Sequence, residues 1–288
     1  MADNVPYLFD AEFYCSAYSD LAHLTPEEAT EHFRLYGSAE GRLGHAWAYR
    51  DAFLERVHLL SSVLEIGPFC NPILRGANVR YLDMFDASEL RRRAIAHGLN
   101  AAGCPERIHY MGDISCIDEI FDGVVSSHSI EHQPDLIGHL EGVTRILRPK
   151  LGRYYLIVPD KRYCFDHFVP KSTVGDVVQA HEERRTVHTL KSVIDHFSLK
   201  THNDSSAHWR GEHGELQSKC QAERIIEALD VYRSTTGYID VHGWYFTPES
   251  FWHIVSMLHA IGLIQLRPVE IHPTAYNSIE FYAVLQRD

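Results

Sequence analysis

Short runs of apolar residues alternate with helix-like segments through the middle of the chain. Three of these runs are apolar without polar alternation, namely VLEI, GVVSS and YYLIV, which is typical of strands buried on both faces of a parallel sheet. The runs predict strands at 61–67, 78–84, 107–113, 121–129 and 152–160. Helices are expected between 84 and 100, ending at Gly98, and over about 134–147. Strands that alternate with helices in this way predict a doubly wound, Rossmann-like α/β domain.

We place this core at 49–160. The segments outside it have a different pattern of polar and apolar residues. Residues 1–48 predict an N-terminal helical cap, because a Thr-Pro-Glu-Glu sequence opens a helix within them. Residues 161–240 are polar, rich in histidine and too long for an ordinary loop, so they predict a helical insertion on the acceptor side. Residues 241–288 predict a last helix and a strand hairpin that completes the sheet.

Charge and cysteine content indicate which classes of partner and which compartment to expect. The chain has 27 Lys and Arg against 39 Asp and Glu, a net charge of −12, which repels a phosphate backbone and makes nucleic acid an unexpected partner. No apolar stretch predicts a membrane span, and the N-terminus has acids where a signal peptide carries Lys or Arg. The six cysteines form no C-x-x-C pair, so we expect reduced thiols without disulfides, in a cytoplasmic protein.

Carboxylates stand at the ends of successive expected strands. Glu65 closes the first, Asp83 the second, Asp113 the third and Asp160 the fifth. Singly, each could be a helix cap or a surface acid. Because ligands of open α/β sheets lie beyond the carboxyl ends of the strands, the series instead indicates a site for a ligand that offers hydroxyls, amines and a cation.

In these motifs the chain resembles the class I S-adenosylmethionine-dependent methyltransferases. VLEIG resembles their first motif, and SSHSIEH followed by LRPKLGRYYLIVPD resembles the fourth and fifth. The resemblance implies seven strands with the last one antiparallel, S-adenosylmethionine as cofactor, ribose binding by Asp83, and adenine binding by Asp113 with the backbone N–H of Ile114. The cofactor-binding residues that it implies are Glu65, Gly67, Pro68, Asp83, Asp113, Ile114, Ser127 and His128. More narrowly, VPDKRYCFD and HGWYFTPESF resemble a bacterial subgroup associated with glycan modification.

The first motif departs from the family at its second glycine. Gly67 is followed by Pro68, Phe69 and Cys70, so the usual G-x-G is absent. This puts a cofactor pressed closely on the loop backbone in doubt. The absence of G-x-G-x-x-G also disfavours a dinucleotide such as NAD.

Methyl transfer to a hydroxyl needs a base, and histidine titrates in the right range. His128, at the end of the fourth strand, is the first candidate, with His132 close behind it; hydrogen bonding of His128 to backbone is an equally weighted alternative. Lys161 and Arg162 follow the fifth strand and would suit an anionic acceptor, unless they are surface charges. The acceptor-binding residues that we expect are Asp160, Lys161, Arg162, His242 and Trp244.

The histidines of the insertion leave open whether the protein binds a divalent metal. They are His181, His188, His196, His202, His208 and His213, among Asp195, Asn203, Asp204 and Glu212. Imidazoles and carboxylates would suit a divalent metal that lowers the pKa of a hydroxyl acceptor. Because H-E-x-x-H is absent, an acceptor pocket or polar helix surfaces are favoured over a metal.

The sequence therefore predicts a transferase that O-methylates a small polar acceptor, such as a sugar, a nucleotide sugar or an intermediate of glycan biosynthesis. Two alternatives from other classes stay open. One is a non-catalytic module that binds S-adenosylmethionine or docks in glycan assembly, and the other is a metal-dependent hydrolase built on the histidines. A homodimer is left open as well.

Overall fold

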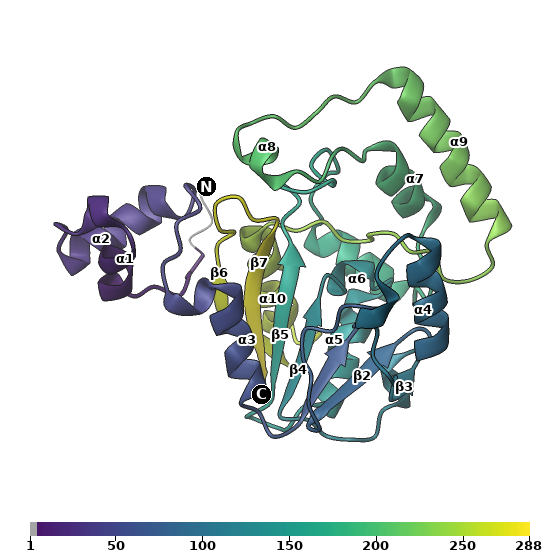
Figure 1. Cartoon of the computed structure of the whole chain (residues 1–288), viewed down its shortest axis with the longest axis horizontal. Coiled ribbons are helices and arrows are strands. Elements are labelled where there is room, and N and C mark those ends of the chain that lie inside the picture. Colours follow the sequence, from purple (N-terminus) through teal and green to yellow (C-terminus); the bar gives the residue numbers. More distant parts are fainter. Residues whose placement is uncertain (1–4) are drawn as a thin grey trace.

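A computed structural model describes residues 5–288 and contains a seven-stranded sheet in the order β3-β2-β1-β4-β5-β7-β6 (Figure 1). The strands are β1 (Val63–Ile66), β2 (Val79–Asp83), β3 (Tyr110–Met111), β4 (Gly123–Ser127), β5 (Arg153–Pro159), β6 (Leu266–His272) and β7 (Glu280–Arg287). β1 to β5 are parallel to one another, whereas β7 is antiparallel to both β5 and β6. The predicted fold class, a doubly wound α/β sheet with an antiparallel last strand, is confirmed.

Both faces of this sheet are covered, which explains its continuously apolar strands. The helices that flank it are α3 (Arg50–His58), α4 (Ala87–Ala96), α5 (Leu136–Ile146), α6 (Val174–Glu182) and α10 (Pro248–Ala260). Val124 packs in the cluster that contains α5 and α10, while its neighbour Val125 packs against α3. Since successive strand residues point to opposite faces, every position of β4 needs an apolar or small side chain.

The expected strands and helices are shorter than predicted, the third strand most of all. The third strand spans only two residues, because it lies at the edge of the sheet and pairs only through Tyr110 and Met111 with the end of β2. The helix after β2 ends at Ala96, ahead of Gly98, which adopts a left-handed φ of 69°. A glycine just past a helix end commonly takes this conformation.

The N-terminal helices have an apolar cluster of their own. α1 (Ala11–Ala17) and α2 (Pro26–His32) lie beside the β6 edge of the sheet in Figure 1. Tyr14 and Phe33 are at the centre of the cluster. Thr25 caps α2 through a capping box with Glu28, as the Thr-Pro-Glu-Glu sequence predicts. The helical nature of this segment is confirmed, and its independence as a domain stays a prediction.

Helices of the insertion lie beyond the ends toward which the parallel strands point (Figure 1). They are α7 (Leu190–Ser198), α8 (Ser205–Trp209) and α9 (Ser218–Ser234). α7 and α9 pack together through Val193 and Ala228. α6, by contrast, packs in the main core beside α5. From α9 the chain returns to α10 across the top of the sheet.

One expectation about the cysteines is wrong. The structure joins Cys70, after β1, to Cys104, after α4, in a disulfide within a small apolar cluster. Their separation of 34 positions in the sequence gave no local spacing signal. Among the described residues, no helix is both long and apolar enough to cross a membrane.

Candidate active site

Glu65 holds the loop that follows β1. Its side chain is buried, and its two carboxylate oxygens accept hydrogen bonds from the backbone N–H groups of Ile73 (2.8 Å) and Leu74 (3.0 Å). Burial raises the pKa of Glu65 to about 7, against the opposing effect of these hydrogen bonds. Glu65 thus shapes the loop from within, and its contact with a methionine moiety stays a prediction.

The loop itself keeps a tight turn although its second glycine is missing. Gly67 has a φ of 70°, and a Cβ there would lie 3.1 Å from Oγ of Ser129. Phe69, at the position of the missing glycine, also adopts a positive φ of 43°. Its backbone N–H donates to Oδ2 of Asp83 at 3.2 Å, which ties this strained residue to the end of β2. Pro68, between them, is buried.

Asp83 and Asp113 lie after neighbouring strands, as the resemblance implies. Asp83 ends β2, and burial raises its pKa. Asp113 is exposed and follows β3, where its Oδ1 accepts the N–H of Ser115 at 2.8 Å. Burial opposes ionisation of Asp113, but hydrogen bonds with Ser115 lower its pKa. The side chain of Ile114 packs in the core.

His128 follows β4 in a left-handed conformation with a φ of 50°. Its Nε2 lies 2.9 Å from Oε2 of Glu280, the first residue of β7, and Glu280 also pairs with Arg50. Burial opposes protonation of His128, but the hydrogen bond with Glu280 and the charge of Glu131 raise its pKa. Ser127 lies within 3.4 Å of the Arg50 guanidinium. The ring of His128 is therefore held by a carboxylate and not by backbone.

Glu131 lies in the 3₁₀ turn Ile130–His132 with no exposed surface. Its Oε1 lies 4.0 Å from Nδ1 of His128, 3.8 Å from Nε2 of His132 and 3.9 Å from Nε2 of His242. Within residues 5–288 neither carboxylate oxygen has a hydrogen-bond partner. We call Glu131, His128, His132 and His242 the Glu131 cluster.

Acidic residues hold the outer side of each imidazole in this cluster. Asp240 lies 3.0 Å from Nδ1 of His132, and Asp166 lies 2.6 Å from Nδ1 of His242. Glu131 lies within the SSHSIEH motif, but the sequence alone indicated no role for it. Its outer partners come from distant segments that carry no local signal.

Most of the residues expected to bind an anionic acceptor form hydrogen bonds with other residues of the protein. Asp160 has no exposed surface and accepts from Arg162 (2.6 Å) and Thr274 (2.6 Å). Lys161 donates to the backbone carbonyl of His167 at 2.7 Å, and burial lowers its pKa. Trp244 is buried and donates to a backbone carbonyl. This geometry favours structural roles for these residues.

Some of the insertion's histidines group around His167, with the ring of His202 stacked on His208 at 4.2 Å, and the rest are dispersed. His167, His208 and His213 stack, with 3.7 Å between the ring centroids of His167 and His213; we call these three the histidine stack. The others contact separate partners: His181 contacts Asp135, His188 the carbonyl of His132, His196 the backbone N–H of His242, and His202 the carbonyl of Glu212.

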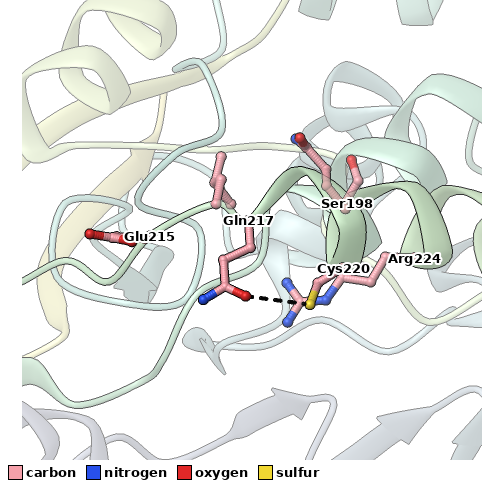
Figure 2. A pocket seen from close by; sticks show the side chains of 7 residues that line it. Ser198, Glu215, Gln217, Cys220 and Arg224 are labelled. Carbon is pink, nitrogen blue, oxygen red and sulfur yellow. Dashed lines mark hydrogen bonds between the residues drawn. The ribbon is translucent and has the colours of Figure 1, made fainter.

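A surface pocket in the insertion contains none of the predicted site residues. Figure 2 shows it between the end of α7 and the start of α9, with Ser198, Glu215, Gln217, Cys220 and Arg224 around it. In it, the thiol of Cys220 contacts Oε1 of Gln217 at 3.8 Å.

Comparison with known proteins shows similarity only at the level of structure. No family model and no curated protein matches the sequence. The mitomycin 7-O-methyltransferase MmcR is 13% identical with a TM-score of 0.40, over 94% of this chain and 60% of that protein, so this chain spans about three fifths of its length. An S-adenosylmethionine-dependent methyltransferase from Clostridium acetobutylicum is 10% identical with a TM-score of 0.39, over 82% of this chain and 88% of that one. The CcbJ methyltransferase from Streptomyces caelestis is 12% identical with a TM-score of 0.40, over 82% and 86%. At these identities the likeness is one of fold.

Proposed function

We propose that this protein is an S-adenosylmethionine-dependent methyltransferase that O-methylates a small polar acceptor, such as a sugar, a nucleotide sugar or a glycan intermediate. The observation that carries the proposal is the order of the strand ends. β1, β2 and β3 are adjacent and parallel, so the Gly67 turn, Asp83 and Asp113 lie in sequence along one edge of the sheet. That edge is where an open α/β sheet binds its ligand.

The residues at this edge fit the cofactor. Asp83 accepts two backbone N–H groups, from Phe69 and Phe85, yet a carboxylate offers about four acceptor sites, which leaves room for the two ribose hydroxyls. Asp113 is exposed and can accept from an adenine amino group. Bound S-adenosylmethionine would supply a sulfonium methyl group for in-line displacement, a reaction in which alignment provides much of the rate.

His128 is the proposed general base. A carboxylate only accepts hydrogen bonds, so Glu280 selects the tautomer with hydrogen on Nε2 and leaves Nδ1 as the proton acceptor. Arg50 fixes Glu280 in turn, and through it the plane of the imidazole. Nδ1 can then take the proton of an acceptor hydroxyl.

Calorimetry with S-adenosylhomocysteine tests the proposal. We expect one equivalent to bind, and S-adenosylmethionine incubated with a panel of sugars and nucleotide sugars to yield a product one methyl group heavier by mass spectrometry. Binding without transfer to any hydroxyl would favour the non-catalytic module. Absence of binding would overturn the proposal.

A further inference from the structure

The Glu131 carboxylate is an unusual feature of the strand-end edge. It has no exposed surface, and no residue in the described range donates a hydrogen bond to it. Burying a carboxylate without a partner is costly, so native proteins pair such a group or coordinate it to a cation. The structure around Glu131 supplies imidazoles but no donor at hydrogen-bond distance.

Two imidazoles turn their Nε2 atoms toward this carboxylate. The Nδ1 of His242 lies 2.6 Å from Asp166, and the Nδ1 of His132 lies 3.0 Å from Asp240. Because the Asp166 carboxylate accepts, the proton of His242 belongs on Nδ1, and its Nε2 lone pair faces Glu131. Nδ1 of His132 lies close to Asp240 but outside hydrogen-bond geometry, and its Nε2 also faces Glu131. Nε2 of each ring lies 3.8–3.9 Å from Oε1 of Glu131, beyond hydrogen-bond length.

We propose that Glu131, His132 and His242 bind one divalent transition-metal ion, of the Zn²⁺, Co²⁺ or Mn²⁺ class. Their ligand atoms all lie within 4.8 Å of one another. Metal bonds of about 2.0–2.2 Å place two ligands up to about 4.2 Å apart, so a small inward movement of the side chains completes the site. Two histidines and one carboxylate suit this class of ion and leave coordination positions open.

Asp166 and Asp240 are positioning residues for the two histidine ligands, His242 and His132. A carboxylate that accepts the second N–H of a histidine ligand fixes its tautomer and raises its basicity, and such pairs are usual around protein-bound metals. The ligand atoms of the histidine stack also lie within 4.8 Å of one another, and backbone carbonyls hold His208 Nε2 and His167 Nδ1, but the stack offers no carboxylate ligand.

The site lies one helical turn from His128, whose Nδ1 is 4.0 Å from Glu131. On the proposed methyltransferase function, the open positions of the metal would take the acceptor hydroxyl and lower its pKa beside that base. Metal binding itself does not depend on that function. The inference therefore assigns the metal to the end of β4 and not to the insertion's histidines.

Titration of the metal-free, untagged full-length chain with Co²⁺ tests the site, because bound Co²⁺ acquires visible absorption bands that report its ligands. We expect one equivalent in the wild type. Affinity should fall more than about 100-fold in Glu131→Gln and His242→Ala, and about 10- to 100-fold in Asp166→Asn. His213→Asn, in the histidine stack, should bind as the wild type does.

Thermal unfolding separates loss of the site from loss of the fold. Zn²⁺ should raise the Tm of the wild type and leave that of Glu131→Gln unchanged, while metal-free Glu131→Gln should unfold no earlier than metal-free wild type, because it removes a buried unpaired charge. Wild type that binds no Co²⁺, or binding abolished by His213→Asn alone, would overturn the inference. If the wild type binds S-adenosylhomocysteine but does not bind Co²⁺, the metal inference is wrong and the proposed function remains intact.

Discussion

The Glu131 cluster and the histidine stack contain similar numbers of imidazoles but arrange them differently. In the stack, the rings of His167 and His213 lie face to face at an angle of 11°; Nδ1 of His167 contacts a backbone carbonyl, and Nδ1 of His213 contacts Nδ1 of His208. In the Glu131 cluster, the rings converge on one buried carboxylate. Proximity of histidines is thus a poor guide to a metal site, and the direction of their nitrogens is a better one.

The difference follows from what holds the outer nitrogen of each ring. Asp166, Asp240 and Glu280 fix the imidazoles of the Glu131 cluster, and each acid comes from a different segment of the chain. In the stack, the ring of His208 bridges His202 and His213 within the same insertion. Convergence on Glu131 therefore required segments from across the chain, whereas the stack is assembled within residues 161–240.

The largest expected effect concerns catalysis. His128→Asn keeps a hydrogen-bonding group but cannot accept the proton, so kcat should fall by roughly 10²- to 10⁴-fold. Steady-state assays should show unchanged S-adenosylhomocysteine affinity for this variant and a near wild-type kcat for His213→Asn. Near-full activity in His128→Asn would move the base elsewhere and weaken the contrast between the two groups.

The next effect concerns cofactor binding. The proposal assigns the ribose to Asp83, which belongs to neither the Glu131 cluster nor the histidine stack. Asp83→Ala should weaken S-adenosylhomocysteine binding by about 2–4 kcal/mol, since two hydrogen bonds to a charged acceptor are lost. Asp86→Ala is a matched control, because Asp86 is an exposed acid three residues later that caps α4. Calorimetry that gives equal affinities for the two variants would contradict the placement of the ribose.

The fold was predictable because its signals are local. Continuous apolar runs mark β1, β4 and β5, since a strand covered on both faces has no polar side, and Thr-Pro pairs mark the starts of α2 and α10. The site was only partly predictable. Asp83 and His128 stand directly after strands, but Glu280 reaches His128 from 152 residues away and Glu131 looks like an ordinary helical acid in sequence. The roles of Arg162 and Asp160 depend on a mutual contact that no spacing reveals.

A third environment extends the comparison: a buried histidine without a hydrogen-bond partner among residues 5–288, whose Nε2 lies 3.9 Å from Glu270. His272, in β6, has no exposed surface, and neither of its ring nitrogens has a hydrogen-bond partner in the part of the chain described here. Burial lowers its pKa to about 4. The unfolded chain takes up this proton below about pH 6.5 and the folded chain only near pH 4, so stability should fall as the pH drops through that range.

At pH 5 this histidine should cost about 2 kcal/mol relative to neutral pH. His272→Leu keeps an apolar side chain of similar size against Phe53 and should flatten the dependence between pH 7 and pH 5 by that amount. Urea unfolding at both pH values measures it. An unchanged slope in the variant would show that other buried histidines, such as His139, account for acid sensitivity.

The smallest expected effect lies in the histidine stack itself. His213→Asn removes the 3.0 Å contact between the Nδ1 atoms of His213 and His208 and the stacking of its ring on His167, so urea unfolding at pH 7.5 should show a loss of about 1 kcal/mol. Burial lowers the pKa of both His208 and His213, so protonation below about pH 6.5 should weaken the stack in the wild type and bring the two proteins closer in stability. A gap that instead widens as the pH falls would mean that the stack is stabilised by a proton. That outcome would contradict the lowered pKa of these two rings.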